Sequence, residues 1–459
     1  MIHKYSLFGY NIAIDIESGS VHILSDTAFN MLGYLENLAH VPGFAGFPEE
    51  CPTDIRYHLA KFDSSDINGA YAELAGLYDD GLLFSEPEKL DLEYSGIVKA
   101  LCLNIAHDCN MMCQYCFAGK GDFGLSKKLM SEETGLQAVK FLMENSGGRK
   151  NLEVDFFGGE PLINFKTVEN IVLKTRELEK DYNKNVRFTL TTNGTLLDDA
   201  KIDFINEHIS NIVLSLDGLP ETNDGVRKYN GGGGVYSDIV PLYQKLVSQR
   251  DKNKDYYVRG TFTRKNLNFA KDVIHIAGLG FKNISVEPVV LDENDEYAVR
   301  REDLPAVFRE YETLAREIIK RERRNSGQFS FFHFNIDLDA GPCVYKRSKG
   351  CGAGSEYLAV TPEGDIYPCH QFVGNLDFKL GNVSENNISR NKLTRDFFDN
   401  NIILNEACNN CWVKYFCGGG CAANNQKFNH DIYAPYEIAC EMEKKRVECA
   451  IAIQAVLSV

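Results

Sequence analysis

The cysteines are distributed very unevenly along the chain, and this limits what the chain can fold into. Cys109, Cys113 and Cys116 lie close together, and no further cysteine occurs before Cys343. Nine of the fourteen cysteines then lie between Cys343 and Cys449. In a reducing cytosol such a pattern is no disulfide framework, so most of these cysteines are predicted to bind metal, act as nucleophiles or fill small core positions.

Length and charge exclude several classes of protein. The chain has 459 residues, of which 44% are hydrophobic, enough for two or three globular domains. A net charge of −16 argues against nucleic acid and anionic membrane surfaces as partners. No apolar run reaches the roughly 18 residues of a membrane span, and residues 1–5 do not begin a signal peptide. We therefore expect a cytoplasmic protein without nucleic-acid or membrane partners.

Residues 1–90 are predicted to form a small domain of their own. Residues 2–24 alternate between apolar and polar side chains, which indicates a hairpin. Helix-spaced apolar residues follow at 29–35 and 67–77, and a short strand is expected at 82–84. This order favours a winged-helix-like domain, and a merely decorative N-terminal extension is the alternative.

Residues 97–325 alternate between predicted strands and helices. Strands are expected at 98–105, 152–157, 186–191, 211–216, 256–262 and 282–287, and helices at 131–145, 166–182, 198–208, 235–249, 267–279 and 303–323. Six strands separated by helices imply right-handed crossovers and a parallel sheet. The predicted fold class is therefore α/β, either an open doubly wound sheet or a partial (β/α)6 barrel, with the chemistry at the carboxyl ends of the strands.

Residues 336–459 form the third predicted domain. The part from 336 to 440 is rich in loops and cysteines and has few periodic apolar runs, whereas a helix is expected from residue 437 onward. Such a segment has little apolar area to bury, so metal crosslinks are predicted to substitute for part of its core.

The strongest local motif is Cys109-x3-Cys113-x2-Cys116, directly after the first strand of the predicted barrel. Three thiolates can hold three corners of a four-iron cluster and leave the fourth iron open, and a zinc site is the alternative. With Tyr115 before the last cysteine and five further βα units behind it, the motif resembles the signature of the radical S-adenosylmethionine (SAM) enzymes. This resemblance implies that the three cysteines are catalytic cluster ligands and that SAM is a cofactor.

A second motif, from Gly158 to Pro161, supports the same resemblance. Its two glycines let a backbone approach a ligand closely, and Glu160 offers an acceptor to the ammonium group of SAM. The resemblance further implies contacts to the ribose or carboxylate of SAM, although ordinary turn and capping roles remain open for the residues concerned. The candidate cofactor-binding residues are Tyr115, Gly158, Gly159, Glu160, Asn193, Ser215, Asp217 and Arg227.

The C-terminal cysteines have a spacing that resembles the SPASM extension of radical SAM enzymes, with a structural zinc pair as the alternative. The resemblance implies two auxiliary 4Fe-4S clusters, and thus three clusters in all. One would be held by Cys408, Cys411, Cys417 and Cys440, and the other by Cys351, Cys369 and Cys421. Cys343 is either an eighth ligand or leaves an open iron that could capture a substrate thiolate. Cys102 and Cys449 are expected to be small buried residues.

The whole chain resembles the maturases of small cysteine-rich clostridial peptides, the class with six cysteines in forty-five residues. This resemblance implies an oxidoreductase that forms thioether crosslinks in a ribosomally made precursor peptide, whose leader docks on a sheet edge of the N-terminal domain. It also implies a low-potential electron donor such as flavodoxin or ferredoxin. The alternatives are an anaerobic sulfatase maturase that forms formylglycine and a non-catalytic iron-sulfur electron carrier. No histidine is an obvious acid or base, and His370, beside Cys369, is the one to test.

Overall fold

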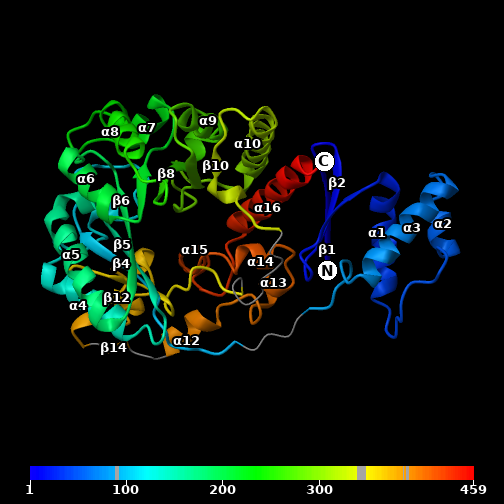
Figure 1. The fold of residues 1–459 in the computed structure, drawn as a ribbon, viewed down its shortest axis with the longest axis horizontal. Coiled ribbons are helices and arrows are strands. Elements are labelled where there is room, and N and C mark those ends of the chain that lie inside the picture. Colours follow the sequence, from blue (N-terminus) through cyan, green and yellow to red (C-terminus); the bar gives the residue numbers. More distant parts are fainter. Residues whose placement is uncertain (88–91, 339–347, 386, 389–391) are drawn as a thin grey trace.

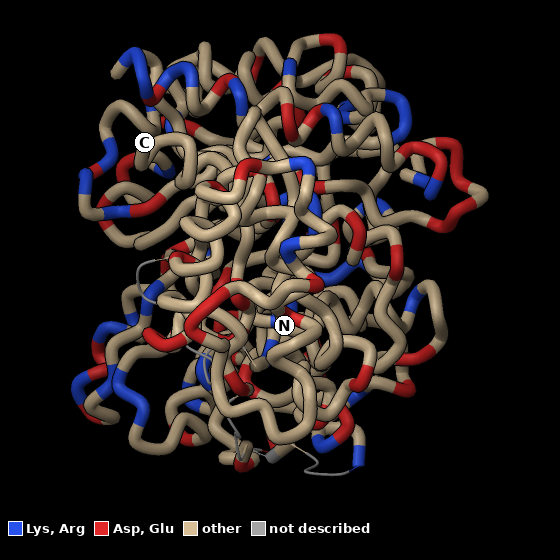
Figure 2. Tube along the Cα trace, turned by 90° about the vertical axis from the view of Figure 1, so that its right-hand side faces the viewer, with Lys and Arg blue, Asp and Glu red and all other residues tan. Residues whose placement is uncertain are grey.

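The computed structural model describes residues 1–87, 92–338, 348–385, 387–388 and 392–459 (Figure 1). Figure 1 shows the N-terminal strands and helices on one side, the large sheet with its helices on the other, and the C-terminal helix between them. Asp and Glu occur along most segments with Lys and Arg interspersed (Figure 2), so the negative charge is spread over the chain. In the described part of the chain, every helix is too short or too polar to cross a membrane.

The N-terminal part is a three-stranded antiparallel sheet followed by three helices. The strands are β1 (Ile2–Leu7), β2 (Tyr10–Asp15) and β3 (Val21–Leu24), in the order β1-β2-β3, and the helices are α1 (Asp26–Ala39), α2 (Thr53–His58) and α3 (Ser64–Asp79). The predicted hairpin corresponds to β2 and β3. The strand predicted at 82–84 is wrong, because Phe84 has a φ of 56°, a left-handed conformation that does not occur within a strand.

The six strands predicted between 97 and 325 are all present and form one parallel run. They are β4 (Ala100–Ala106), β5 (Asn151–Gly158), β6 (Asn185–Thr192), β7 (Asn211–Ser215), β8 (Asp255–Phe262) and β9 (Asn283–Pro288). The helices between and after them are α4 (Glu132–Glu144), α5 (Phe165–Tyr182), α6 (Asp199–His208), α7 (Pro220–Val226), α8 (Tyr236–Ser248), α9 (Ala270–Gly278) and α10 (Leu304–Arg324). The predicted mixed α/β class with a parallel sheet is thus confirmed.

The large sheet extends beyond these six strands on both sides. β10 (Ser330–Phe331) pairs with β9, and β11 (Tyr357–Val360) pairs in parallel with β4. β12 (Asp365–Tyr367), β13 (Gly381–Asn382) and β14 (Asn387–Ile388) then continue the sheet as antiparallel strands. The sequence predicted metal crosslinks in place of a core here. Instead, the buried residues Leu358, Ala359 and Val360 attach this segment to the barrel sheet, so its order does not depend on metal alone.

The helices of the C-terminal segment are short except for the last one. They are α12 (Lys392–Asp399), α13 (Glu406–Asn409), α14 (Lys414–Cys417), α15 (Ala422–Asn429) and the predicted C-terminal helix α16 (Glu437–Leu457). Alternating residues of β2 face opposite sides of the small sheet. Ile12 and Ile14 are buried in the same core as Val447 and Ala450 of α16, whereas Ala13 belongs to the core under helices α1 to α3.

A buried ion pair fixes the N-terminal sheet to the cysteine-rich segment. Lys414 Nζ lies 2.8 Å from Glu17 Oε1, and both side chains are only 6% exposed. The hydroxyl of Tyr415 donates to Glu17 Oε2 at 2.6 Å. Close by, the ring of His3 stacks on Trp412 with 3.7 Å between the ring centroids. The turn between β2 and β3 is therefore anchored on the chain between Cys411 and Cys417.

We expect Glu17→Ala to destabilise the fold because it leaves the Lys414 ammonium group buried without its carboxylate. The loss in unfolding free energy should be about 3 kcal/mol. Urea unfolding can be followed through Trp412, the sole tryptophan, which lies at this contact. Glu169→Gln is the matched control, because its partner Lys166 is 79% exposed and the change should stay below about 1 kcal/mol. Equal unfolding midpoints for the two variants would contradict the role given to Glu17.

Candidate functional site

The loop that carries the first three cysteines is tied to the loop after β5 by two backbone hydrogen bonds. Gly159 N donates to Ala106 O at 2.8 Å, and Glu160 N donates to Asp108 O at 2.9 Å. A Cβ atom at Gly158 would lie 2.4 Å from Ala106 O, and one at Gly159 would lie 2.1 Å from Asp108 O. The contact between the two loops therefore requires these glycines sterically, in addition to the close approach to a ligand that the sequence predicts.

A second segment holds the same cysteine loop from the other side. Met112 N donates to Lys228 O at 2.8 Å, and Gln114 N donates to Val226 O at 3.0 Å. The cysteine loop thus lies between the loop after β5 and the chain that follows α7. Backbone atoms rather than flexible side chains fix its course, so the cysteine positions are set by the fold itself.

A cavity of about 190 Å³ at the carboxyl ends of the barrel strands collects most of the predicted residues. It is lined by Cys109, Cys113, Cys116, Tyr115, Gly158, Gly159, Glu160, Asn193, Ser215 and Arg227. Sequence reasoning missed Phe117, Phe157, Arg259 and Thr261, which line the same cavity. In the described ranges no three His, Cys, Asp or Glu side chains converge as ligands of one metal ion would. The cysteines of a four-iron cluster bind separate irons, so they need not converge on one point.

The chemistry of the three thiols suits an iron-sulfur cluster. Burial raises the pKa of Cys109 to about 12 and, against the nearby charge of Arg227, that of Cys113 to about 11. Without a cation these thiols therefore keep their protons, and a bound metal centre is needed to turn them into thiolates. Soft sulfur donors select zinc, copper(I) or iron-sulfur clusters over hard cations.

Glu160 is almost completely buried and accepts three hydrogen bonds. Its Oε1 accepts from Leu162 N at 3.0 Å and from Thr192 Oγ1 at 2.7 Å, and its Oε2 accepts from Asn193 N at 2.8 Å. Burial raises the pKa of Glu160 to about 7 despite these donors. A carboxylate has about four acceptor positions, so one position remains for an ammonium group, whose charge would keep Glu160 ionised.

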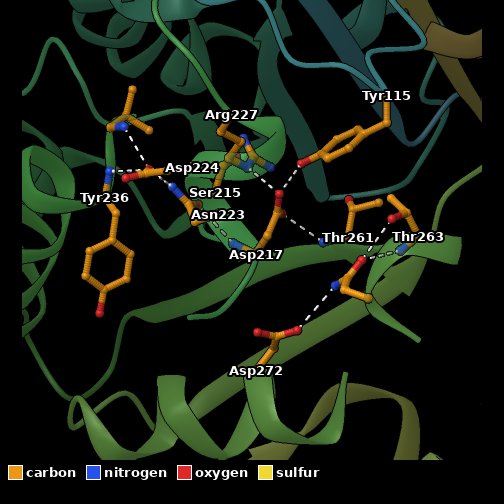
Figure 3. A network of polar contacts seen from close by, with 12 residues as sticks. Tyr115, Ser215, Asp217, Asn223, Asp224, Arg227, Tyr236, Thr261, Thr263 and Asp272 are labelled. Carbon is orange, nitrogen blue, oxygen red and sulfur yellow. Dashed lines mark hydrogen bonds and ion pairs between the residues drawn. The ribbon is translucent and has the colours of Figure 1, made fainter. Parts of the chain in front are cut away.

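Asp217 organises the wall of the cavity from behind (Figure 3). Its Oδ2 accepts from the hydroxyl of Tyr115 at 2.6 Å and from Arg227 Nε at 3.0 Å, while its Oδ1 accepts from Thr261 N at 2.9 Å. The carboxylate is fully buried and does not line the cavity. Asp217 thus holds Tyr115 and Arg227 in place, and its own contact with the cofactor stays a prediction.

Asn193 and Ser215 both line the cavity, as the sequence predicted for cofactor contacts. Asn193 Nδ2 donates to Asn110 Oδ1 at 3.0 Å and lies 3.8 Å from Cys109 Sγ. The carbonyl of Ser215 accepts from the hydroxyl of Tyr243 at 3.2 Å, which holds the end of β7 against α8. Asn193 therefore links the end of β6 to the cysteine loop.

A second cavity, of about 420 Å³, lies in the cysteine-rich segment. Cys408, Cys411, Cys417 and Cys440 line it together. These are the four cysteines that the SPASM resemblance assigned to one auxiliary cluster. Burial raises the pKa of Cys417 to about 12 and those of Cys408 and Cys440 to about 11, so these thiols too require a cation to ionise.

The other predicted set, Cys351, Cys369 and Cys421, also lies together. Burial, together with the neighbouring charges of Cys421 and Cys351, raises the pKa of Cys369 to about 12. Cys343 lies outside the described residues. Cys102 and Cys449 are 1% and 0% exposed, which confirms that they are buried.

Two segments of the chain match known domain families. Residues 103–258 match the radical SAM superfamily, and residues 351–412 match the SPASM iron-sulfur cluster-binding domain. The chain therefore contains a radical SAM domain and a SPASM domain. The first match covers the cysteine loop and the cavity residues up to Arg227, and the second covers four of the C-terminal cysteines, Cys351, Cys369, Cys408 and Cys411.

Three known proteins illustrate this similarity. The radical SAM cyclopropyl synthase TigE of Paramaledivibacter caminithermalis is 23% identical over 85% of this chain and 84% of its own length. The serine-type anaerobic sulfatase-maturating enzyme of Klebsiella aerogenes is 25% identical over 71% of this chain and 83% of its own. The crystal structure of Streptococcus suis SuiB bound to S-adenosylmethionine aligns with a TM-score of 0.51 and 17% identity over 94% of this chain and 96% of its own. The likeness to SuiB supports the fold.

We expect Gly159→Ala to disrupt the cysteine loop, because the new methyl group would lie 2.1 Å from Asp108 O. Displacing the loop by about 1 Å should lower SAM cleavage to 5'-deoxyadenosine about a hundredfold. Iron content after anaerobic reconstitution should fall with it. Gly231→Ala is the control, because a Cβ atom there meets nothing within 4 Å. Full cleavage activity in Gly159→Ala would show that the loop contact does not set the cysteine positions.

Proposed function

We propose that this protein is a radical SAM enzyme that installs thioether crosslinks, from a cysteine sulfur to a carbon atom, in a ribosomally made cysteine-rich peptide. The observation that carries the proposal is an edge of the N-terminal sheet that pairs with no described strand and lies beside a groove, in a chain with radical SAM and SPASM domains. The proposal assigns residues 1–90 to leader recognition, 97–325 to the radical SAM barrel and 336–459 to the SPASM domain.

The free edge is that of β3. Asp15 N donates to Ser20 O at 3.0 Å, so in the antiparallel pair of β2 and β3 the next hydrogen-bonded residue of β3 is His22. Val21 and Ile23 therefore direct their main-chain N–H and C=O groups away from β2. Because β3 is the last strand of this sheet, these groups are suited to bind an added extended strand.

A groove of about 480 Å³ runs along this edge. It is lined by residues 19–23 on one side, by Glu73 and Leu77 of α3 on another, and by Gln454 and Ala455 of α16. An extended leader peptide on β3 would thus place its side chains between two helices. Main-chain hydrogen bonds would supply affinity, and the helix residues would supply selectivity.

The similar proteins support a peptide substrate. SuiB, which has been solved with its precursor peptide SuiA, aligns over 93% of this chain in that complex at a TM-score of 0.50. The TigE match also extends further along this chain than the match to the sulfatase-maturating enzyme, at 85% against 71%. More of this chain is therefore shared with TigE than with the sulfatase-maturating enzyme.

The proposed reaction assigns distinct tasks to the chain's own residues. Cys109, Cys113 and Cys116 would hold the catalytic cluster, and the two C-terminal cysteine sets would hold the auxiliary clusters. Glu160 would accept the ammonium group of SAM, and Asp217 keeps Tyr115 and Arg227 at the cavity wall. When bound, SAM and the clusters supply the carbon radical that removes a hydrogen atom and accept the surplus electron. A low-potential flavodoxin or ferredoxin would supply the first electron.

The second candidate function is sulfatase maturation, which the Klebsiella aerogenes relative favours. In that case the substrate would be a sulfatase and the product would contain formylglycine. Deleting residues 1–90 is a poor way to separate the two functions, because the deletion would uncover the face of α16 that packs on Ile12 and Ile14. Product analysis and a point variant on β3 separate them without disturbing that contact.

We expect the purified anaerobic enzyme, with SAM and dithionite, to remove two hydrogens per crosslink from the cysteine-rich peptide encoded nearest to its gene. One S–H and one C–H bond break while one C–S bond forms, so the mass falls by two hydrogens per bridge. Tandem mass spectrometry should locate each bridge, and iodoacetamide should no longer label the bridged cysteines. A peptide of unchanged mass, with a sulfatase motif converted instead, would establish the second candidate function.

We expect Ile23→Pro to weaken leader binding about tenfold or more, because proline removes an edge N–H without touching the hydrogen bonds between β2 and β3. Fluorescence anisotropy of a labelled leader peptide measures the affinity. Ile23→Val keeps the N–H and serves as the control. SAM cleavage without peptide should stay at the wild-type level in both variants. Equal leader affinity in Ile23→Pro and Ile23→Val would exclude β3 as the docking edge.

A further inference from the structure

The inner face of the barrel sheet is polar and open to solvent. In β8, Val258, Gly260 and Phe262 are buried, whereas the alternating residues Arg259 and Thr261 are not. The same alternation occurs in β5, β6 and β7. Successive side chains of a strand point to opposite faces, and the helices lie on the outer side of the sheet in Figure 1. The accessible set therefore faces the inside, where Phe157, Thr191, Ser215, Arg259 and Thr261 line the cysteine cavity.

Arg259 and Glu287 form an ion pair on this inner face. Arg259 Nε and Nη2 lie 3.1 Å and 3.0 Å from Glu287 Oε1. The two side chains keep 46% and 36% of their surface exposed. Burial opposes ionisation of Glu287, but the charge of Arg259 outweighs it and lowers the pKa to about 2. No hydrogen bond from the described residues reaches Glu287 Oε2, so one acceptor and several guanidinium N–H groups remain available.

This ion pair borders the cavity of the first cysteines, which reaches towards the C-terminal ones. Arg259 lines the cavity of Cys109, Cys113 and Cys116. Phe157, which lines the same cavity, lies with its ring 5.0 Å from the ring of His370, the neighbour of Cys369. A substrate that reacts between the first cysteines and the C-terminal ones would therefore pass the Arg259–Glu287 pair.

We propose that the Arg259–Glu287 pair binds a main-chain amide of the substrate peptide next to the residue that reacts. The free guanidinium N–H groups donate to the peptide carbonyl, and Glu287 Oε2 accepts from the peptide N–H. This inference rests on the proposed function, since it requires a peptide substrate at the inner face of the sheet.

The chemistry of the pair selects an amide over a charged ligand. A peptide unit offers one donor and one acceptor, which matches the free acceptor and donors of the pair. A phosphate or carboxylate would be attracted by Arg259 but repelled by the ionised Glu287. A cation would be attracted by Glu287 but repelled by Arg259. Because every residue has the same main-chain groups, such a site holds a peptide at several successive positions without reading its sequence.

The test compares Arg259→Gln and Glu287→Gln with a matched pair at the other end of the strands. Arg187 lies 2.8 Å from Asp255, and their side chains are 51% and 60% exposed, but neither lines the cysteine cavity. Arg187→Gln is therefore the control. The probe is the cysteine-rich peptide encoded nearest to the gene, and the readouts are KM, the 5'-deoxyadenosine formed per modified peptide, and SAM cleavage without peptide.

We expect Arg259→Gln and Glu287→Gln to raise the KM for the peptide about tenfold or more and to increase the 5'-deoxyadenosine formed per product. SAM cleavage without peptide should stay unchanged in Glu287→Gln, because Glu287 does not line the cysteine cavity, and this also shows that the variant is folded. Arg187→Gln should match the wild type in every readout. If the wild type modifies the peptide and Glu287→Gln matches Arg187→Gln, the inference is overturned while the proposed function stands. Loss of peptide-free cleavage in Glu287→Gln would assign the pair to the cofactor and overturn the inference. A wild type that neither binds nor modifies the peptide would overturn the proposed function and the inference with it.

Discussion

The hydrogen bonds from Gly159 and Glu160 to the carbonyls of Ala106 and Asp108 are the contact on which the rest of the site depends. They join the ends of two neighbouring parallel strands, so the cysteine loop begins at a fixed point above the sheet. The same backbone that donates these bonds also carries the Glu160 carboxylate into the cavity. A single contact therefore positions both the cysteine loop and the Glu160 carboxylate. Only glycine at positions 158 and 159 leaves room for this contact.

Burial of three acidic groups in this site favours their protonated forms unless positive charge is added. The thiols of Cys109 and Cys113 and the carboxyl of Glu160 all have raised pKa values. Arg227 brings one positive charge, but its Nε is already bound to Asp217. Positive charge from iron and from an ammonium or sulfonium group would ionise all three acids together. Cluster and cofactor binding are thus expected to favour each other and to release protons.

Sequence reasoning succeeded where the signal was local. The apolar runs of β4 to β9 and the cysteine spacings can be recognised within a few consecutive residues. The strands and the cysteine groups could therefore be predicted. It failed where distant segments decide the outcome. The pairing of β11 with β4 joins residues more than 250 positions apart. Asp217 is buried because Tyr115, Arg227 and Thr261, which come from other segments, bind its carboxylate. Arg259 could have been noticed as a charged residue within an otherwise apolar strand.

Buried contacts fix the small N-terminal sheet to the cysteine-rich segment. Glu17, in the turn that leads into β3, forms its buried ion pair with Lys414, between Cys411 and Cys417. The opposite face of the same sheet completes the core of helices α1 to α3. A leader peptide on β3 would therefore bind to a sheet whose distance from the auxiliary cysteines is fixed by buried contacts. Under the proposed function the leader would stay at one place while the following part of the peptide reaches the cysteine cavity, and the length of the segment between them would determine which residues can react.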